Sequence, residues 1–217
     1  MINASHLRDA IAAVALSALA ASGIASATSD AAFQGASQSF ARASSGDDSA
    51  IDAAAAAFEA LRLAEPGNPV LTAYAGASVA LQAKTASAPF KKMSLAEDGL
   101  ALIDKALAML TPAHDAPIER GTPGSLEVRF VAANTFLGVP SFMNRAARGK
   151  KLLNEVLASP LFDKAPLPFQ GSVWLRAAQL ATKEQRPEDA RRYLNEIVSH
   201  DAPQADRARV LLKGSAP

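Results

Sequence analysis

Few side chains in this sequence are suited to acid–base, nucleophilic or metal chemistry. Cysteine is absent, and the three histidines are His6, His114 and His200. His114 stands beside Asp115 in a proline-bounded loop, and this pair falls short of the three or four converging ligands that a zinc site needs. His200 comes at the end of an expected helix, where a cation interacts favourably with the helix dipole. We therefore expect structural roles for His114 and His200, with no metal and no cofactor.

The motifs that mark common catalytic sites are missing. The sequence holds no Gly-x-Ser-x-Gly, His-Glu-x-x-His or Ser-x-x-Lys pattern. The glycines between Ile118 and Ser125 resemble a phosphate-binding loop, but no Gly-Lys-Ser/Thr ending follows them. We therefore expect no catalytic residue and no enzyme activity. A hydrolase is the alternative, and it would need a buried pair of carboxylates that the sequence does not reveal.

Two basic clusters are candidates for contact with an acidic partner. Lys91 and Lys92 open an expected helix, where cations oppose the helix dipole. Arg145, Arg148 and Lys151 recur every three residues and therefore share one helix face. This second cluster has no interleaved aromatic residues, and the 22 basic and 21 acidic residues of the chain nearly balance, so nucleic acid is not an expected partner. Solvated helix faces are the alternative interpretation of both clusters.

The elements that must position these residues are helices separated by prolines. Proline lacks a backbone donor and fixes its own φ, so it tends to end a helix or to begin one. Between the prolines apolar residues recur with helical spacing, and no segment alternates as a strand would. An all-α fold is therefore predicted. The expected helices are Ala31–Ala43, Ser49–Ala64, Val70–Ala83, Pro89–Leu110, Ser125–Leu137, Phe142–Ala158, Phe169–Thr182, Pro187–Ser199 and Gln204–Leu212.

The first 27 residues have the pattern of a secretory signal peptide. Arg8 precedes an uncharged, alanine-rich stretch from Ala10 to Ser29, and Ala25-Ser26-Ala27 is the small-x-small pattern of a cleavage site. An amphipathic first helix is the alternative. We expect cleavage after Ala27, a periplasmic or secreted protein, and no stable membrane insertion of residues 28–217. Export without cysteine fits a bacterial periplasm, where the fold must be stable without disulfides.

The last third of the chain resembles the tetratricopeptide repeat. The matching residues are Trp174, Ala177, Ala178, Ala181, Ala190, Leu194 and Pro203. Ala54, Phe58 and the turn Glu65–Pro69 similarly resemble the second helix and the exit turn of such a repeat. The resemblance implies a right-handed α-solenoid of about four helical hairpins plus a C-terminal closing helix over residues 28–217. Other helical-hairpin solenoids remain as alternatives, because the middle hairpins match the pattern poorly.

The same resemblance implies a binding groove. In this family the first helices of the hairpins line a concave surface that binds an extended peptide or a helix. The positions that the resemblance carries to this groove are Glu127, Phe130, Asn134, Leu137, Ser172, Leu175, Gln179 and Thr182. Phe130 and Leu175 are equally suited to the core.

Two hypotheses on function follow. The first is a non-catalytic periplasmic scaffold or adaptor that binds a partner protein or peptide in the groove. The second is a small-ligand-binding accessory protein of an envelope transport system. Its pocket would lie near Val70–Ala80, closed by the loop Thr111–Gly124. An open groove with a protein partner favours the first, and a deep pocket with converging polar groups favours the second.

Overall fold

The computed structural model describes residues 30–117 and 121–214, and the predicted all-α fold is confirmed there. Regular structure in these two ranges is helical, apart from one isolated bridge between Pro117 and Pro123. The predicted signal peptide, residues 1–27, lies outside the described residues. The helices are residues 30–44, α2 (Ile51–Ala64), α3 (Pro69–Gln82), α4 (Pro89–Ala108), α5 (Gly124–Gly138), α6 (Ala146–Leu157), α7 (Leu167–Lys183), α8 (Pro187–Ser199) and α9 (Ala205–Gly214). Short 3-10 turns are η1 (Asp48–Ala50), η2 (Pro112–Asp115), η4 (Ser141–Met143) and η5 (Phe162–Lys164).

Proline and asparagine set several of the helix starts. Pro69, Pro89 and Pro187 are the first residues of α3, α4 and α8, where the missing donor costs nothing. The side chain of Asn68 caps α3 by accepting hydrogen bonds from the backbone N–H groups of Val70, at 3.0 Å, and of the following residue. The predicted bounds Pro187–Ser199 coincide with those of α8.

The expected helix Phe142–Ala158 is interrupted at its start. Residues Ser141–Met143 form the short turn η4, Asn144 takes a left-handed conformation with φ 55°, and α6 begins only at Ala146. Asparagine tolerates this conformation better than most residues. The ring of Phe142 is 64% exposed, so no packing holds it in a longer helix.

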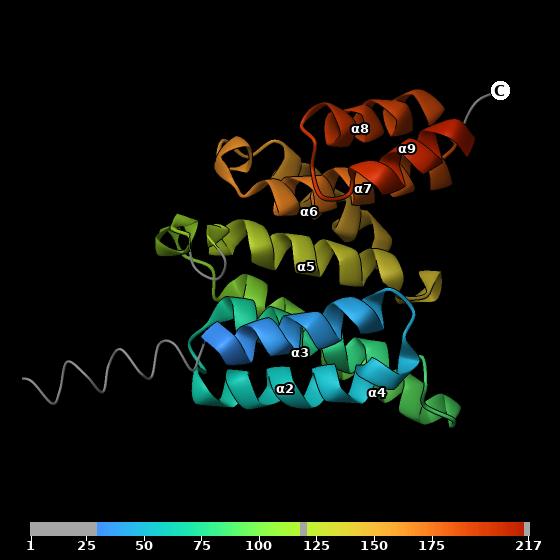
Figure 1. The fold of residues 1–217 in the computed structure, drawn as a ribbon. Coiled ribbons are helices and arrows are strands. Elements are labelled where there is room, and N and C mark those ends of the chain that lie inside the picture. Colours follow the sequence, from blue (N-terminus) through green and yellow to red (C-terminus); the bar gives the residue numbers. More distant parts are fainter. Residues whose placement is uncertain (1–29, 118–120, 215–217) are drawn as a thin grey trace, which may run out of the picture.

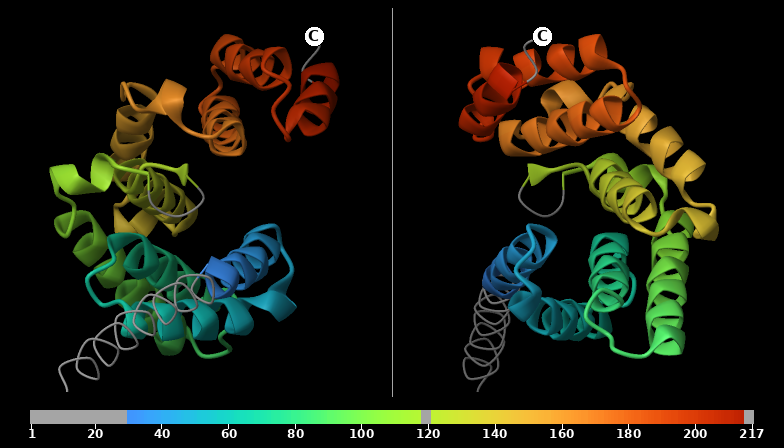
Figure 2. Two further views of the ribbon diagram at one scale, coloured as in Figure 1. Left: turned by 60° about the vertical axis from the view of Figure 1, so that its left-hand side comes forward. Right: turned by 90° about the vertical axis from the view of Figure 1, so that its right-hand side faces the viewer.

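Helices that follow one another in the chain pack side by side. The closest pairs are α3 with α4, α5 with α6 and α7 with α8, and α2 and α9 pack against α3 and α8. In Figure 1 the pairs follow one another along the molecule, from α2–α4 at one end to α7–α9 at the other. Figure 2 (left) shows the helix 30–44 and α9 on the same side of a curved arrangement. Among the described helices, none is both long and apolar enough to span a membrane.

Two glycines bring α3 and α4 into backbone contact. A Cβ added at Gly99 would lie 2.6 Å from the carbonyl oxygen of Gly76 and 2.6 Å from the backbone nitrogen of Ala80. Since real Cβ atoms do not approach so closely, only glycine fits at this crossing. All residues of α3 from Pro69 to Ser78 are buried as a result of this contact and of the neighbouring helices.

Four aromatic rings join the helix 30–44 to α2 and α3. Phe58 and Tyr74 stack with centroids 4.7 Å apart, and Phe33 and Phe40 meet both of them edge-on. The hydroxyl of Tyr74 donates a hydrogen bond of 2.8 Å to Glu127 Oε1 on α5. A buried hydroxyl thus finds the polar partner it needs, and this bond connects α3 to α5.

Candidate functional site

Residues of α5 and α7 that were predicted to line a groove share one face of the molecule. We call it the α5–α7 face and define it by Phe130, Asn134, Phe169, Ser172, Arg176 and Gln179. The rings of Phe130 and Phe169 meet edge-to-face with centroids 5.4 Å apart, so the two helices contact here through aromatic side chains. Phe130 and Asn134 are partly exposed, and Gln179 is exposed.

Arg176 is a charged residue of this face that has no counter-ion in the part of the chain that the structure describes. One guanidinium nitrogen, Nη2, lies 3.5 Å from the carbonyl oxygen of Asn134, which is the long limit of a hydrogen bond. Its Nε is buried and finds no acceptor, and among the described residues no carboxylate lies within ion-pair distance of it. Desolvation by burial lowers the pKa of Arg176, but an arginine stays protonated in proteins. The α5–α7 face therefore holds an uncompensated positive charge.

The neighbouring charges on α7 do not neutralise Arg176. Lys183 follows it by seven residues, which places it on the same side of the helix, and it is exposed. Glu184, which follows Lys183 in the chain, forms ion pairs with other residues. Lys150 and Arg186 donate to its carboxylate, which holds the pKa of Glu184 below its usual value. The charged residues described at this end of α7 therefore supply no free carboxylate to Arg176.

Several residues predicted for the groove lie elsewhere. Glu127 is 1% exposed because its carboxylate faces Tyr74 inside the protein, and Leu175 is part of the apolar core. Leu137 packs against α6, since a Cβ at Gly149 would lie 2.8 Å from its Cγ. Repeat spacing alone could not predict the burial of these positions, because their burial depends on the helices that cover them.

The predicted groove residues of α7 differ in their surroundings. Ser172 accepts a hydrogen bond of 3.0 Å from Gln204, so the segment that leads into α9 covers the start of α7. Thr182 is exposed and donates to the carbonyl oxygen of Ala178 at 3.0 Å. The open part of the α5–α7 face therefore centres on Phe130, Asn134, Arg176 and Gln179.

The two basic clusters have different environments. Lys91 and Lys92 are exposed in the first turn of α4. Arg145 and Arg148 both pair with Asp104 of α4, the first at 3.2 Å, and both guanidinium groups lie over the ring of Phe136. These arginines join α6 to α4, which leaves less of their charge available to a partner.

His114 has the structural role expected from the sequence. The backbone N–H of Thr111 donates to His114 Nδ1 at 3.0 Å, and the hydroxyl of Thr111 lies at the same distance. The imidazole thus caps the turn η2. No group of three or more potential metal ligands occurs among the described residues.

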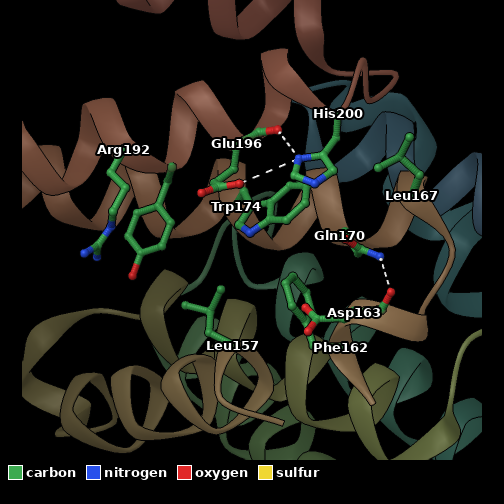
Figure 3. Close-up of a pocket in the computed structure, with 10 residues that line it drawn as sticks. Leu157, Phe162, Asp163, Leu167, Gln170, Trp174, Arg192, Glu196 and His200 are labelled. Carbon is green, nitrogen blue, oxygen red and sulfur yellow. Dashed lines mark hydrogen bonds and ion pairs between the residues drawn. The ribbon is translucent and has the colours of Figure 1, made fainter. Parts of the chain in front are cut away.

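A pocket of about 590 Å³ opens between the turn η5, α7 and α8. We call it the α7–α8 pocket, and Figure 3 shows the side chains that line it. Its aromatic residues are Phe162, Trp174 and Tyr193, and its polar residues are Asp163, Gln170, Arg192, Glu196 and His200. This volume lies within the range of small-molecule sites.

Trp174 and His200 form one side of this pocket. Their rings lie 5.1 Å apart at an interplanar angle of 32°, and Phe162 meets the indole edge-on at 5.6 Å. His200 Nδ1 lies 2.9 Å from the carbonyl oxygen of Glu196, one turn earlier in α8. The imidazole is therefore at the helix end, as predicted, but it also lines a pocket that the sequence did not reveal.

The charged residues of the pocket differ in their ion-pair partners. Arg192 lies over the ring of Tyr193 at 4.9 Å and shares the carboxylate of Asp189 with Arg186, so Asp189 offsets only part of its charge. The Glu196 carboxylate lies 3.6 Å from His200 Nδ1, and the side chain of Asp163 is exposed. Two carboxylates thus line a cavity of mixed aromatic, aliphatic and polar character.

Comparisons with protein-family models, with curated proteins and with solved structures found no match to this chain. Function has to be argued from the two sites themselves. The sequence patterns predicted neither Arg176 nor the α7–α8 pocket as a site. The one signal in the sequence was the lone arginine between apolar residues of α7, whereas the contact of Trp174 with His200 appears only in the fold.

Proposed function

We propose that this protein is a non-catalytic adaptor that binds an acidic peptide segment of a partner protein at the α5–α7 face. The observation that carries the proposal is Arg176, a desolvated guanidinium for which residues 30–117 and 121–214 supply no carboxylate partner. A buried charge is costly when it is unpaired, and a bound carboxylate would recover part of that cost. Phe130 and Phe169 beside it offer apolar contact to the neighbouring peptide residues.

The proposal includes the tetratricopeptide-like architecture and the export of the protein. Helices packed in neighbouring pairs support a right-handed solenoid whose first helices α3, α5 and α7 line the concave side. The small-x-small pattern before residue 28 supports a periplasmic or secreted location. No nucleic acid and no cofactor are part of this function.

The small-ligand alternative loses support at the place where the sequence put it. The segment Val70–Ser78 of α3 is buried by its neighbours, so it offers no open ligand surface. A small ligand would find a cavity in the α7–α8 pocket instead. This pocket lies on the side of α7 that carries Trp174, away from Arg176.

The test is an array of 12-residue peptides in matched sets that differ only by Glu, Gln or Lys at one position. The labelled wild-type protein should bind a subset of Glu peptides, and the matched Gln peptides should bind about tenfold or more weakly, since a charge-assisted hydrogen bond is lost. Arg176→Met should abolish this preference. Arg207→Met, at an exposed arginine of α9, is the matched control and should leave it unchanged.

Two results would overturn the adaptor proposal. One is binding of Glu and Gln peptides with equal affinity, and the other is a Glu preference that persists in Arg176→Met. Circular dichroism melts of both variants separate a lost contact from a lost fold. Absence of binding to every peptide of the array would also count against the proposal.

A further inference from the structure

We propose that the α7–α8 pocket is a second binding site, which takes a primary ammonium group at the end of an alkyl chain. The shared chemistry is that of a lysine side chain or of a free alkylamine. This inference does not depend on the adaptor function. Trp174 and Arg176 are two residues apart on α7 and therefore point about 200° apart around the helix.

The apolar lining suits an alkyl chain. Phe162, Trp174 and Tyr193 line the cavity from three different segments, η5, α7 and α8. Trp174 and Phe162 are 7% and 3% exposed, and the guanidinium of Arg192 lies over the ring of Tyr193, so these rings offer apolar contact and not an open face for a cation. The alkyl chain would also lie against Leu157 and Leu167, which complete the apolar part of the lining. The ammonium group at its end needs other partners in the lining.

The carboxylates of the pocket favour a positively charged ligand. Asp163 and Glu196 line the pocket from two sides, as Figure 3 shows. The one arginine of the lining, Arg192, shares the carboxylate of Asp189 with Arg186, so its charge is partly offset there. An anion would meet two carboxylates here, whereas an ammonium group would gain charge-assisted hydrogen bonds from them.

The imidazole of His200 can supply a further acceptor to the ammonium group. When His200 donates its Nδ1 proton to the Glu196 carbonyl oxygen, its Nε2 is an acceptor. Gln170 anchors the wall opposite α8, because its amide donates to the carbonyl oxygen of Ala165 at 2.7 Å. The turn η5 that carries Asp163 and Phe162 is thereby fixed relative to α7.

The experiment uses the indole N–H resonance of Trp174, the single tryptophan of the chain, in ¹⁵N-correlated NMR spectra. The probes are acetyl-Gly-Lys-Gly-amide, the same tripeptide with norleucine in place of lysine, and n-butylamine. We expect the lysine tripeptide to shift the resonance in a saturable way and the norleucine tripeptide to bind at least fivefold more weakly. Equal shifts with both tripeptides, or no shift with any probe, would overturn the proposal.

The three probes and a set of variants locate the site and its ligand source. Comparable affinity for n-butylamine supports a free amine, and a clear preference for the tripeptide supports a lysine of a protein. Glu196→Gln and Asp163→Asn should each weaken binding at least fivefold, while Glu188→Gln, at an exposed carboxylate of α8, should not change it. Unchanged affinity in both pocket variants would contradict the assignment. Arg176→Met should leave this titration intact, so failure here is distinguishable from failure of the adaptor proposal.

Discussion

The helix pairs α3–α4 and α7–α8 differ in the size of the residues at their contacts. At the crossing of α3 and α4 two glycines let the backbones touch, and the lining side chains are small. At α7–α8 a tryptophan, a phenylalanine and a histidine fill the space between the elements. The first interface leaves no room for a Cβ at its crossing, whereas large rings border a pocket at the second. The comparison explains why a pocket lies at the C-terminal pair.

The largest expected effect is that of Trp174→Ala. The indole is 7% exposed and packs between Phe162 and His200, so its removal should lower the free energy of unfolding by about 3–5 kcal/mol. Urea denaturation followed by circular dichroism measures this difference. A loss below about 1 kcal/mol would show that the rings do not hold this pair together.

The next largest effect is expected at the glycine crossing. Gly99→Ala places a Cβ 2.6 Å from the backbone of α3, and the resulting strain should cost about 2–3 kcal/mol. Gly35→Ala is the matched control, because it adds a methyl group to open space in the helix 30–44. It should stabilise the protein by about 0.5–1 kcal/mol through helix propensity. Equal effects of both variants in thermal melts would refute close packing of α3 on α4.

A moderate effect is expected from Tyr74→Phe. The change leaves the buried carboxylate of Glu127 without its 2.8 Å hydrogen bond while the stacked ring on Phe58 is kept. The expected loss is about 1–3 kcal/mol, the cost of leaving a buried polar group without its partner. A double-mutant cycle with Glu127→Gln measures the coupling, and additive losses would show that this bond does not join α3 to α5.

The smallest effect concerns the ion pairs that join α6 to the end of α7. Lys150→Met should lower stability by less than about 1 kcal/mol at pH 7, because the pair with Glu184 is partly exposed. Lys150 and Arg186 depress the pKa of Glu184 in the folded protein, so this contribution is present above the unfolded value of 4.5 and is lost as the pH falls below it. The difference between wild type and variant should therefore shrink as the pH falls through the lowered pKa of Glu184. A difference that grows on acidification would contradict the assignment.

Sequence patterns predicted the helices better than the sites. Prolines and helical periodicity located α8 to the residue, because both act within a few positions of the chain. Asn144 broke the expected helix over Phe142–Ala158, since a left-handed residue leaves no trace in apolar spacing. Phe130 and Asn134 lie on a shared face with α7, as expected, but burial of Glu127 depends on the contact with Tyr74, 53 residues away. Arg176 was overlooked because a missing counter-ion is a property of the folded surroundings.

The most direct test of the adaptor function is a charge exchange at Arg176. On the matched peptide array, wild type should prefer Glu over Lys peptides, and Arg176→Glu should prefer Lys over Glu at the same position, with about tenfold changes in each direction. A folding defect cannot produce such a reversal, which requires contact between residue 176 and the varied peptide position. The account predicts the reversal. Retention of the Glu preference by Arg176→Glu would contradict it.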